Sequence, residues 1–87
     1  MAAFTYIVQC ADGTFYTGWT NDLVSRMAVH NSGKGAKYTR GRTPVTLVYY
    51  EEYPNSKKAQ VREYQIKKMN RQQKAMLIAA FPGDGKA

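Results

Sequence analysis

Two stretches near the N-terminus are rich in β-branched and aromatic residues, and a turn signal separates them. They read AFTYIVQC and TFYTG, with ADG between them. We expect an antiparallel hairpin whose strands lie near residues 3–10 and 14–18. A third stretch, PVTLVYYEE, predicts a strand from Val45 to about Glu52, with Pro44 at its entrance.

The segment NDLVSRMAVHNSG, between the hairpin and the third strand, has the end signals of a helix. Thr20 or Asn21 is the expected cap, and Asp22 suits the first turn. Gly33 follows the last turn. The predicted apolar face consists of Leu23 and Met27, with Val24 and Ala28 as further candidates. Asp22, Arg26 and His30 recur every four residues and therefore share a different face.

Two more helices are expected after the third strand. YPNS breaks the chain, and Ser56 is the expected cap of a helix that runs to about Met69. Asn70 and Gln73 form a capping box for a last helix, RQQKAMLIAAF, which the PG pair at 82–83 stops. The order ββαβαα predicts one α/β (α+β) domain over residues 1–82 with a short tail at 83–87. Its core would be a small three-stranded antiparallel sheet flanked by helices.

Positive charge is concentrated in one part of the chain. The 87 residues include 13 Lys and Arg against 6 Asp and Glu, a net charge of +7. Eleven of the 13 cations lie between Lys34 and Lys74. Such a footprint favours a polyanion as partner. An anionic membrane is the rival, but the basic segment SKKAQVREYQIKKMN lacks the bulky Leu, Phe or Trp face of a membrane-surface helix. We therefore expect nucleic acid and no membrane.

The segment GKGAKYTRGR, residues 33–42, contains four cations and three glycines. One interpretation is a solvated loop. The other is a cradle for phosphates, in which glycines let the backbone approach and cations supply the attraction. The cations are Lys34, Lys37, Arg40 and Arg42.

An acid stands where an apolar residue is expected on the second helix. Glu63 follows Ala59 by four residues and precedes Ile66 by three, on a seam that should face the core. A salt bridge to Lys67 or Lys58 would explain it. For an isolated glutamate the salt bridge is the usual explanation, and the functional alternative is a carboxylate that binds a hard divalent cation.

Tyr6 and Tyr16 have the same parity on the two strands of the expected hairpin, so their rings can approach each other. Gly18 is expected where the second of these strands meets the following helix. Tyrosines in strands mostly contribute to packing, so these two residues indicate a function only in combination with other residues.

In this combination the sequence resembles the GIY-YIG nuclease family. Tyr6 in TYI is at the place of the first tyrosine, although Phe4 and Thr5 replace the glycine and isoleucine of that motif. The triplet YTG, with Tyr16 and Gly18, is similar to the second motif. The resemblance covers about residues 4–69.

Three residues downstream continue the resemblance. Arg26 follows Gly18 by eight residues, where the family has an arginine, and His30 follows four residues later. Glu63 in REYQIKK matches the metal-binding glutamate. The sequence is most similar to small single-domain bacterial members. HN-GKGA--TRGR-P is also similar to the catalytic domain of structure-selective nucleases that cut branched DNA.

The resemblance implies an endonuclease that hydrolyses phosphodiester bonds in branched or flapped DNA during repair or recombination. Glu63 would hold Mg²⁺ or Mn²⁺, and Arg26 would bind the phosphoryl oxygens. Tyr6 or Tyr16 would orient or deprotonate water, and His30 would hydrogen-bond a tyrosine or a phosphate. The loop cations of residues 34–42 would contact DNA.

Two other functions fit the same residues. One is a non-catalytic nucleic-acid-binding module that retains the nuclease fold, and the other is an interaction domain whose basic face binds an acidic protein. The lone Cys10 cannot form an internal disulfide, and MAAFTYIVQC lacks the features of a signal peptide. We therefore expect a cytoplasmic protein that is a monomer or a weak homodimer.

Overall fold

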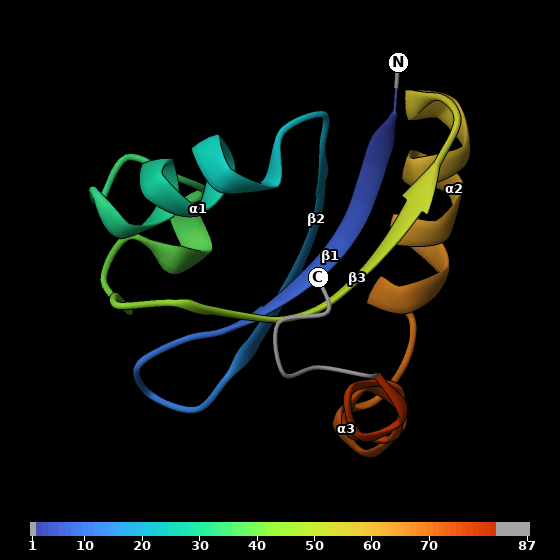
Figure 1. Ribbon diagram of the computed structural model, residues 1–87. Coiled ribbons are helices and arrows are strands. Elements are labelled where there is room, and N and C mark those ends of the chain that lie inside the picture. Colours follow the sequence, from blue (N-terminus) through green and yellow to red (C-terminus); the bar gives the residue numbers. More distant parts are fainter. Residues whose placement is uncertain (1, 82–87) are drawn as a thin grey trace.

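The computed structural model describes residues 2–81 and has the predicted order of elements (Figure 1). The elements are β1 (Ala3–Gln9), β2 (Phe15–Thr20), α1 (Leu23–Asn31), η1 (Lys37–Thr39), β3 (Thr46–Tyr53), α2 (Ser56–Lys67) and α3 (Arg71–Ala80). The strands form one antiparallel sheet in the order β2-β1-β3, which confirms the predicted α+β fold. The short 3-10 helix η1, inside the Gly- and Lys-rich loop, is an addition to the predicted order.

Two helices begin one or two residues away from the predicted cap. Asp22, and neither Thr20 nor Asn21, caps α1, because its carboxylate accepts the backbone N–H three residues ahead at 3.1 Å. Asn55 caps α2 in the same way at 3.0 Å, so Ser56 is the first helical residue and not the cap. Clusters of cap-forming residues explain both errors, because several neighbours have suitable side chains and the backbone selects one of them.

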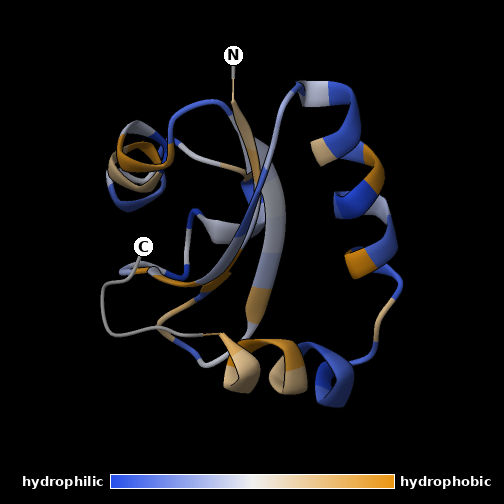
Figure 2. Cartoon of the chain, turned by 45° about the vertical axis from the view of Figure 1, so that its right-hand side comes forward, coloured by the Kyte–Doolittle hydropathy of each residue, from blue (hydrophilic) through white to orange (hydrophobic). Residues whose placement is uncertain are grey.

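The two faces of the sheet are covered by different helices, with α1 on one side and α2 on the other (Figures 1 and 2). Along β1, successive side chains point to opposite faces. Tyr6 and Val8 belong to a core cluster against which Leu23 and Met27 of α1 pack. On the other face, the Thr5 hydroxyl donates a hydrogen bond to the carbonyl of Ala59 in α2 at 2.7 Å.

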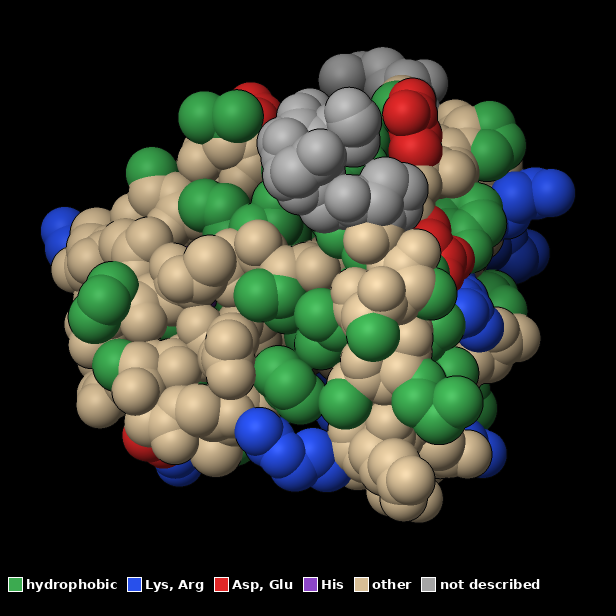
Figure 3. All heavy atoms as spheres, turned by 60° about the horizontal axis from the view of Figure 1, so that its bottom comes forward, with side chains coloured by type: hydrophobic (Ala, Val, Ile, Leu, Met, Phe, Trp, Pro, Cys, Tyr) green, Lys and Arg blue, Asp and Glu red, His purple; other side chains and the backbone are tan. Residues whose placement is uncertain are grey.

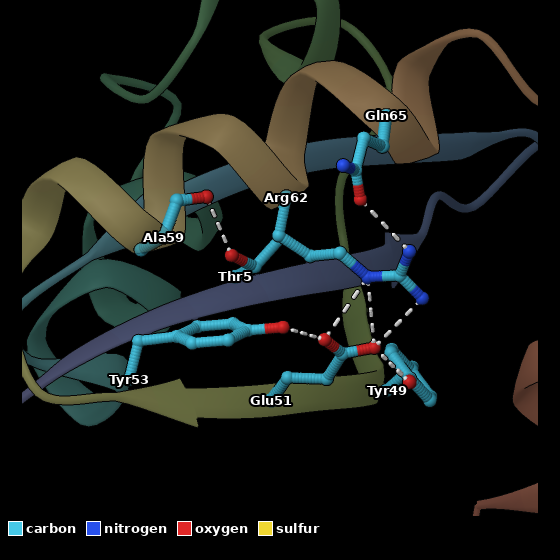
Figure 4. A network of polar contacts seen from close by, with 7 residues as sticks. All are labelled: Thr5, Tyr49, Glu51, Tyr53, Ala59, Arg62 and Gln65. Carbon is cyan, nitrogen blue, oxygen red and sulfur yellow. Dashed lines mark hydrogen bonds and ion pairs between the residues drawn. The ribbon is translucent and has the colours of Figure 1, made fainter.

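A network around Glu51 joins α2 to β3 (Figure 4). The carboxylate of Glu51 accepts hydrogen bonds from the hydroxyls of Tyr49 and Tyr53. Arg62 of α2 reaches the same carboxylate, with its Nε 3.0 Å from Oε1, and also donates to Gln65 at 3.2 Å. Together with the bond from Thr5, this network fixes the position of α2 on the sheet.

Helix α3 lies at one end of the sheet (Figure 1). The predicted capping box is confirmed, since Asn70 and Gln73 exchange hydrogen bonds of 2.8 and 2.9 Å. The predicted stop at 82–83 lies outside the described residues. Phe81 packs against the rings of Tyr49 and Tyr50. On the side of the molecule where α3 lies, hydrophobic side chains cover the middle of the surface, and Lys and Arg lie mainly at its margins (Figure 3).

The lengths and compositions of the helices also bear on membranes. Among residues 2–81, no helix is both long enough and apolar enough to cross a bilayer.

Candidate active site

A chain of buried hydrogen bonds joins β1, α1 and η1 on the face of the sheet that α1 covers. The hydroxyl oxygen of Tyr6 lies 2.9 Å from Nε2 of His30, and Nδ1 of His30 lies 2.9 Å from Oγ1 of Thr39. All three side chains are 0% exposed. His30 therefore contacts a tyrosine, one of its two predicted partners, and its complete burial keeps it from direct contact with a phosphate.

Helix α1 turns Leu23 and Met27 inward, as predicted, and His30 lies on the same side. Leu23, Met27 and His30 are spaced as i, i+4 and i+7, which places them on one side of a helix. Leu23 and Met27 pack against the core, and His30 is the one buried residue of α1. Val24 and Ala28, the further candidates for this face, are both exposed, Val24 by 82%. The i+7 spacing was the signal that links His30 to the interior.

Gly18 lies within β2, directly opposite Tyr6, and not at the end of the strand as predicted. A Cβ atom at this position would lie 2.6 Å from the hydroxyl oxygen of Tyr6 and 3.3 Å from the ring of Tyr16. The first distance is too short for a side chain unless Tyr6 moves, and the second is tighter than most Cβ contacts. Glycine at this position therefore leaves the space that the Tyr6 hydroxyl and the Tyr16 ring occupy.

Arg26 of α1 reaches the same tyrosine from the other side. Its Nε lies 3.4 Å from the Tyr6 hydroxyl oxygen, and the guanidinium retains its two terminal nitrogens for further contacts. Burial raises the pKa of Tyr6 above its ordinary value, while the hydrogen bond and charge of Arg26 oppose that shift. Tyr16 and Glu63 raise it further, so both lie within electrostatic range of this hydroxyl.

Tyr16 differs from Tyr6 in its access to the surface. It is partly exposed, its ring packs edge-on against His30 with centroids 5.6 Å apart, and it stacks on Tyr38 at 5.8 Å. Tyr38 is itself 40% exposed. Of the two predicted tyrosines, Tyr16 is therefore the one that a bound molecule can touch directly.

Glu63 is mostly buried, with 20% of its side chain exposed, between the fully buried Ala59 and Ile66 of α2. Its Oε2 lies 3.2 Å from Nζ of Lys67, which is the salt bridge considered from the sequence. Within residues 2–81, no three His, Cys, Asp or Glu side chains gather as a complete metal site. A single carboxylate nevertheless fits Mg²⁺, which keeps several waters and takes other ligands from substrate phosphates.

Two of the loop glycines are explained by the conformation and packing of the loop itself. Gly33 has a φ of +83° at the end of α1, a conformation that favours glycine. Gly35 passes so close to His30 that an added Cβ would lie 2.8 Å from its Cα. Two of the three glycines therefore shape the loop around His30, which neither sequence interpretation had included.

The four loop cations divide into two groups. Lys34, Lys37 and Arg40 are exposed. Arg42 instead forms an ion pair with Asp12 at 2.5 Å and lies 4.3 Å from the ring centroid of Tyr38. Arg42 is thus held against the β1–β2 turn. Arg40, although exposed, donates from Nε to the carbonyl of Gly35 at 3.4 Å. Its terminal nitrogens remain available, as do the ammonium groups of Lys34 and Lys37, to follow a nucleic-acid backbone.

A second group of cations lies beside the aromatic residues of β2 and was not singled out from the sequence. Nζ of Lys67 is 5.9 Å from the ring centroid of Tyr16, and the guanidinium of Arg71 is 4.4 Å from that of Phe15. Burial lowers the pKa of Lys74, and the charge of Lys67 lowers it further. Positive charge therefore continues from Tyr16 toward the start of α3.

Comparisons with known proteins identify relatives over most of the chain. The family model described as GIY-YIG catalytic domain matches residues 2–76. A UPF0213 protein of Clostridium perfringens is 56% identical over 77 residues, which cover 88% of this chain and 83% of the relative. A UPF0213 protein of Halobacterium salinarum is 54% identical over 84% of this chain and 95% of the relative. The relatives thus include archaeal as well as bacterial proteins.

Solved structures agree with these relatives. The solution NMR structure of the UPF0213 protein BH0048 from Bacillus halodurans has a TM-score of 0.58 at 44% identity, and covers 91% of this chain and 84% of that one. The solution NMR structure of the protein EF2693 from E. faecalis has a TM-score of 0.61 at 36% identity, with the same coverage of 91% and 84%. The chain belongs to the GIY-YIG catalytic-domain family and, within it, to the group of UPF0213 proteins.

Proposed function

We propose that this protein is an endonuclease that depends on a divalent metal ion and cuts branched or flapped DNA during repair or recombination. Membership in the family supports nuclease chemistry. The observation that carries the proposal is the meeting of three elements at the Tyr6 hydroxyl. Arg26 of α1 hydrogen-bonds to it, and Tyr16 of β2 and Glu63 of α2 act on it electrostatically. A titratable group such as Tyr6, whose pKa is raised by burial and whose charged neighbours can be named, is typical of functional sites.

The residues divide the chemistry among them. Arg26 uses its terminal nitrogens to bind the non-bridging oxygens of the phosphate, where negative charge accumulates in the transition state. Tyr16, which is partly exposed, orients the water that attacks phosphorus in line with the leaving oxygen. Tyr6 and His30 are both 0% exposed; Tyr6 positions Arg26 through the hydrogen bond from Nε, and His30 in turn positions Tyr6.

Glu63 is the residue that would hold a divalent ion, Mg²⁺ or Mn²⁺. Nucleases of this family generally use such ions. When bound, the ion supplies positive charge that stabilises the phosphoryl group and the leaving oxygen. Lys67 would have to release the Glu63 carboxylate, and its ammonium group is then free to bind a phosphate.

DNA is the proposed partner, bound by two groups of cations on either side of Tyr16. The loop contributes Lys34, Lys37 and Arg40. The second group consists of Lys67, Arg71 and Lys74. Phosphate contacts of this kind carry no sequence information, which suits an enzyme that recognises the shape of a DNA branch. A cytoplasmic site of action fits this assignment.

A non-catalytic nucleic-acid-binding module is the second candidate. The ion pair between Glu63 and Lys67 favours it, because the ammonium group competes with a metal ion for the carboxylate. This module would bind the same DNA through the same cations and would not cut it.

The test is a cleavage assay with labelled linear, flapped and forked DNA and an RNA duplex, with Mg²⁺, Mn²⁺ or EDTA. The proposal predicts cutting near the branch of flapped or forked DNA only when a divalent ion is present. Binding measured in Ca²⁺ on the same substrates provides the control for the second candidate. Tight binding without cleavage by any divalent ion would replace the enzyme with the binding module.

A further inference from the structure

Thr39 of η1 is completely buried although it lies in a loop of Gly, Lys and Arg. Its side-chain oxygen lies 2.9 Å from Nδ1 of His30 and 2.9 Å from the backbone carbonyl oxygen of Ala36. Threonine side chains are mostly exposed in folded proteins, so the complete burial of this one calls for an explanation. Its contacts define the direction of every hydrogen bond in the chain that leads to Tyr6.

The carbonyl oxygen of Ala36 can only accept hydrogen bonds, and it accepts one from the backbone N–H of Thr39 and one from the Thr39 hydroxyl, each across 2.9 Å. The oxygen of Thr39 must therefore accept from Nδ1 of His30, and Nδ1 carries a proton. Burial lowers the pKa of His30 below its ordinary value, and the charge of Arg26 lowers it further, so the ring is neutral. A neutral imidazole has one N–H, and Nε2 is left as an acceptor.

The acceptor at Nε2 fixes the hydroxyl of Tyr6. Tyr6 donates its proton to Nε2 across 2.9 Å, and its oxygen lone pairs then face away from His30. Arg26 Nε approaches this oxygen as a donor at 3.4 Å. With the opposite tautomer, Nε2–H would point at the Tyr6 oxygen and compete with Arg26 for its lone pairs.

We propose that Thr39 is a positioning residue that fixes the proton of His30 on Nδ1, so that Tyr6 presents only lone pairs to Arg26. The backbone at Gly35, which passes directly over His30, keeps the ring and Thr39 together. The loop thus has a second task besides binding phosphates, because it sets the direction of the bonds that hold the arginine. The consequence for cleavage rests on the proposed function, and the tautomer itself does not.

The test uses nitrogen-15 NMR of the imidazole, because the chain contains one histidine and its two ring nitrogens give unambiguous signals. In the unmodified protein, Nδ1 should resonate as a protonated nitrogen and Nε2 as an unprotonated one at neutral pH. Thr39→Val keeps the shape and removes the hydroxyl, so the signals should shift toward the Nε2–H tautomer. Thr39→Ser restores the hydroxyl and should restore the original spectrum.

The catalytic consequence is measured on the same three proteins. If the protein cuts DNA, Thr39→Val should lower kcat by about tenfold with KM changed by less than about twofold, and Thr39→Ser should recover most of the loss. An Nε2–H tautomer or a fast exchange of tautomers in the unmodified protein would overturn the inference, even if Thr39→Val fails to fold. An inactive protein with the Nδ1–H tautomer would instead overturn only the proposed function.

Discussion

Tyrosines form polar clusters on both faces of the sheet, and the two clusters differ in what the hydroxyl meets. On the α2 face, Tyr49 and Tyr53 donate to the carboxylate of Glu51, which Arg62 also binds through Nε and Nη2 (Figure 4). On the α1 face, Tyr6 donates to a neutral imidazole, and its neighbouring guanidinium has no carboxylate within salt-bridge distance among residues 2–81.

The electrostatics of the two clusters follow from these partners. Burial and the hydrogen bond to Glu51 raise the pKa of Tyr49 and of Tyr53 to about 12. Burial alone would raise the pKa of Glu51, but both hydroxyls and Arg62 outweigh it and hold that pKa below its ordinary value. Each charge is therefore compensated inside the protein. Such a cluster stabilises the fold, and its charged groups are paired with one another and are not available to a ligand.

The α1-face cluster leaves positive charge uncompensated. Arg26 is partly buried and is held by one hydrogen bond from Nε, which leaves its terminal nitrogens for an anion. A buried tyrosine hydroxyl is therefore not by itself a sign of a reactive site. The sign is the arginine beside it whose charge the protein does not neutralise.

The largest effect is expected for Arg26→Lys compared with Arg62→Lys. Both changes keep the charge and lose the planar fork of donors. Arg26→Lys should lower kcat by at least about 100-fold, as for removal of a transition-state donor, with DNA affinity nearly unchanged. Arg62→Lys should leave cleavage unchanged and lower the free energy of unfolding by about 1 kcal/mol. Equal losses of kcat and DNA affinity at Arg26 would make it a binding contact only.

The next largest effect concerns Gly18→Ala. The added Cβ would lie 2.6 Å from the Tyr6 hydroxyl oxygen, so the ring must move. We expect a loss of about 1–3 kcal/mol in the free energy of unfolding, measured by denaturant titration, together with a loss of cleavage. Gly41→Ala is the matched control, because no atom lies within 4 Å of its Cβ position. A stable and active Gly18→Ala protein would mean that Tyr6 need not occupy this place.

A smaller effect concerns the pH dependence of the free energy of unfolding, to which the two clusters should contribute differently. Because burial, with the charge of Arg26, lowers the pKa of His30 below 6.5, the unfolded chain binds a proton more readily than the folded protein. The free energy of unfolding should therefore decrease as pH falls from about 6.5 toward the pKa of folded His30, and that contribution is fully present above this range. His30→Gln should remove this dependence. Tyr49→Phe should retain it, since nothing in the Glu51 cluster titrates there.

The smallest effect is expected in the loop. If exposed Lys34 and Lys37 bind duplex phosphates, replacing both by Gln should reduce the slope of log K against log salt by about 0.9 for each phosphate that they neutralise. Arg42→Gln should change the slope less, because Arg42 is already paired with Asp12. Fluorescence anisotropy at several salt concentrations measures both slopes. An unchanged slope for the double variant would assign the lysines to a solvated loop.

Much of the fold follows from local signals. Strand composition, the turn at ADG and the capping box at Asn70 are properties of neighbouring residues, and each produced an element close to its predicted place. The helix caps were displaced because Thr20, Asn21 and Asp22 all have side chains that can cap, and only the path of the backbone decides between them.

The site was less accessible from the sequence. The resemblance named residues in order, and the structure brings Tyr6, Arg26 and His30 into direct hydrogen-bonded contact. The enclosure of Thr39, and of the backbone at Gly35, depends on a loop that folds back over α1, and no local pattern reports such a contact. The ion pair that engages Arg42 joins residues 30 positions apart and was invisible for the same reason.

The most direct test of the account compares Glu63→Gln, which removes a carboxylate of α2 itself, with Glu51→Gln, which removes the β3 carboxylate that Arg62 of α2 binds. Glu63→Gln should lower metal-dependent cleavage by at least about 100-fold, with DNA affinity equal or slightly higher and stability within about 1 kcal/mol of the unmodified protein. Glu51→Gln should lower the free energy of unfolding by about 1–3 kcal/mol and leave cleavage by the folded protein unchanged. Cleavage that survives Glu63→Gln within a few-fold, at equal metal concentration, would contradict the assignment of Glu63 as the metal-binding residue.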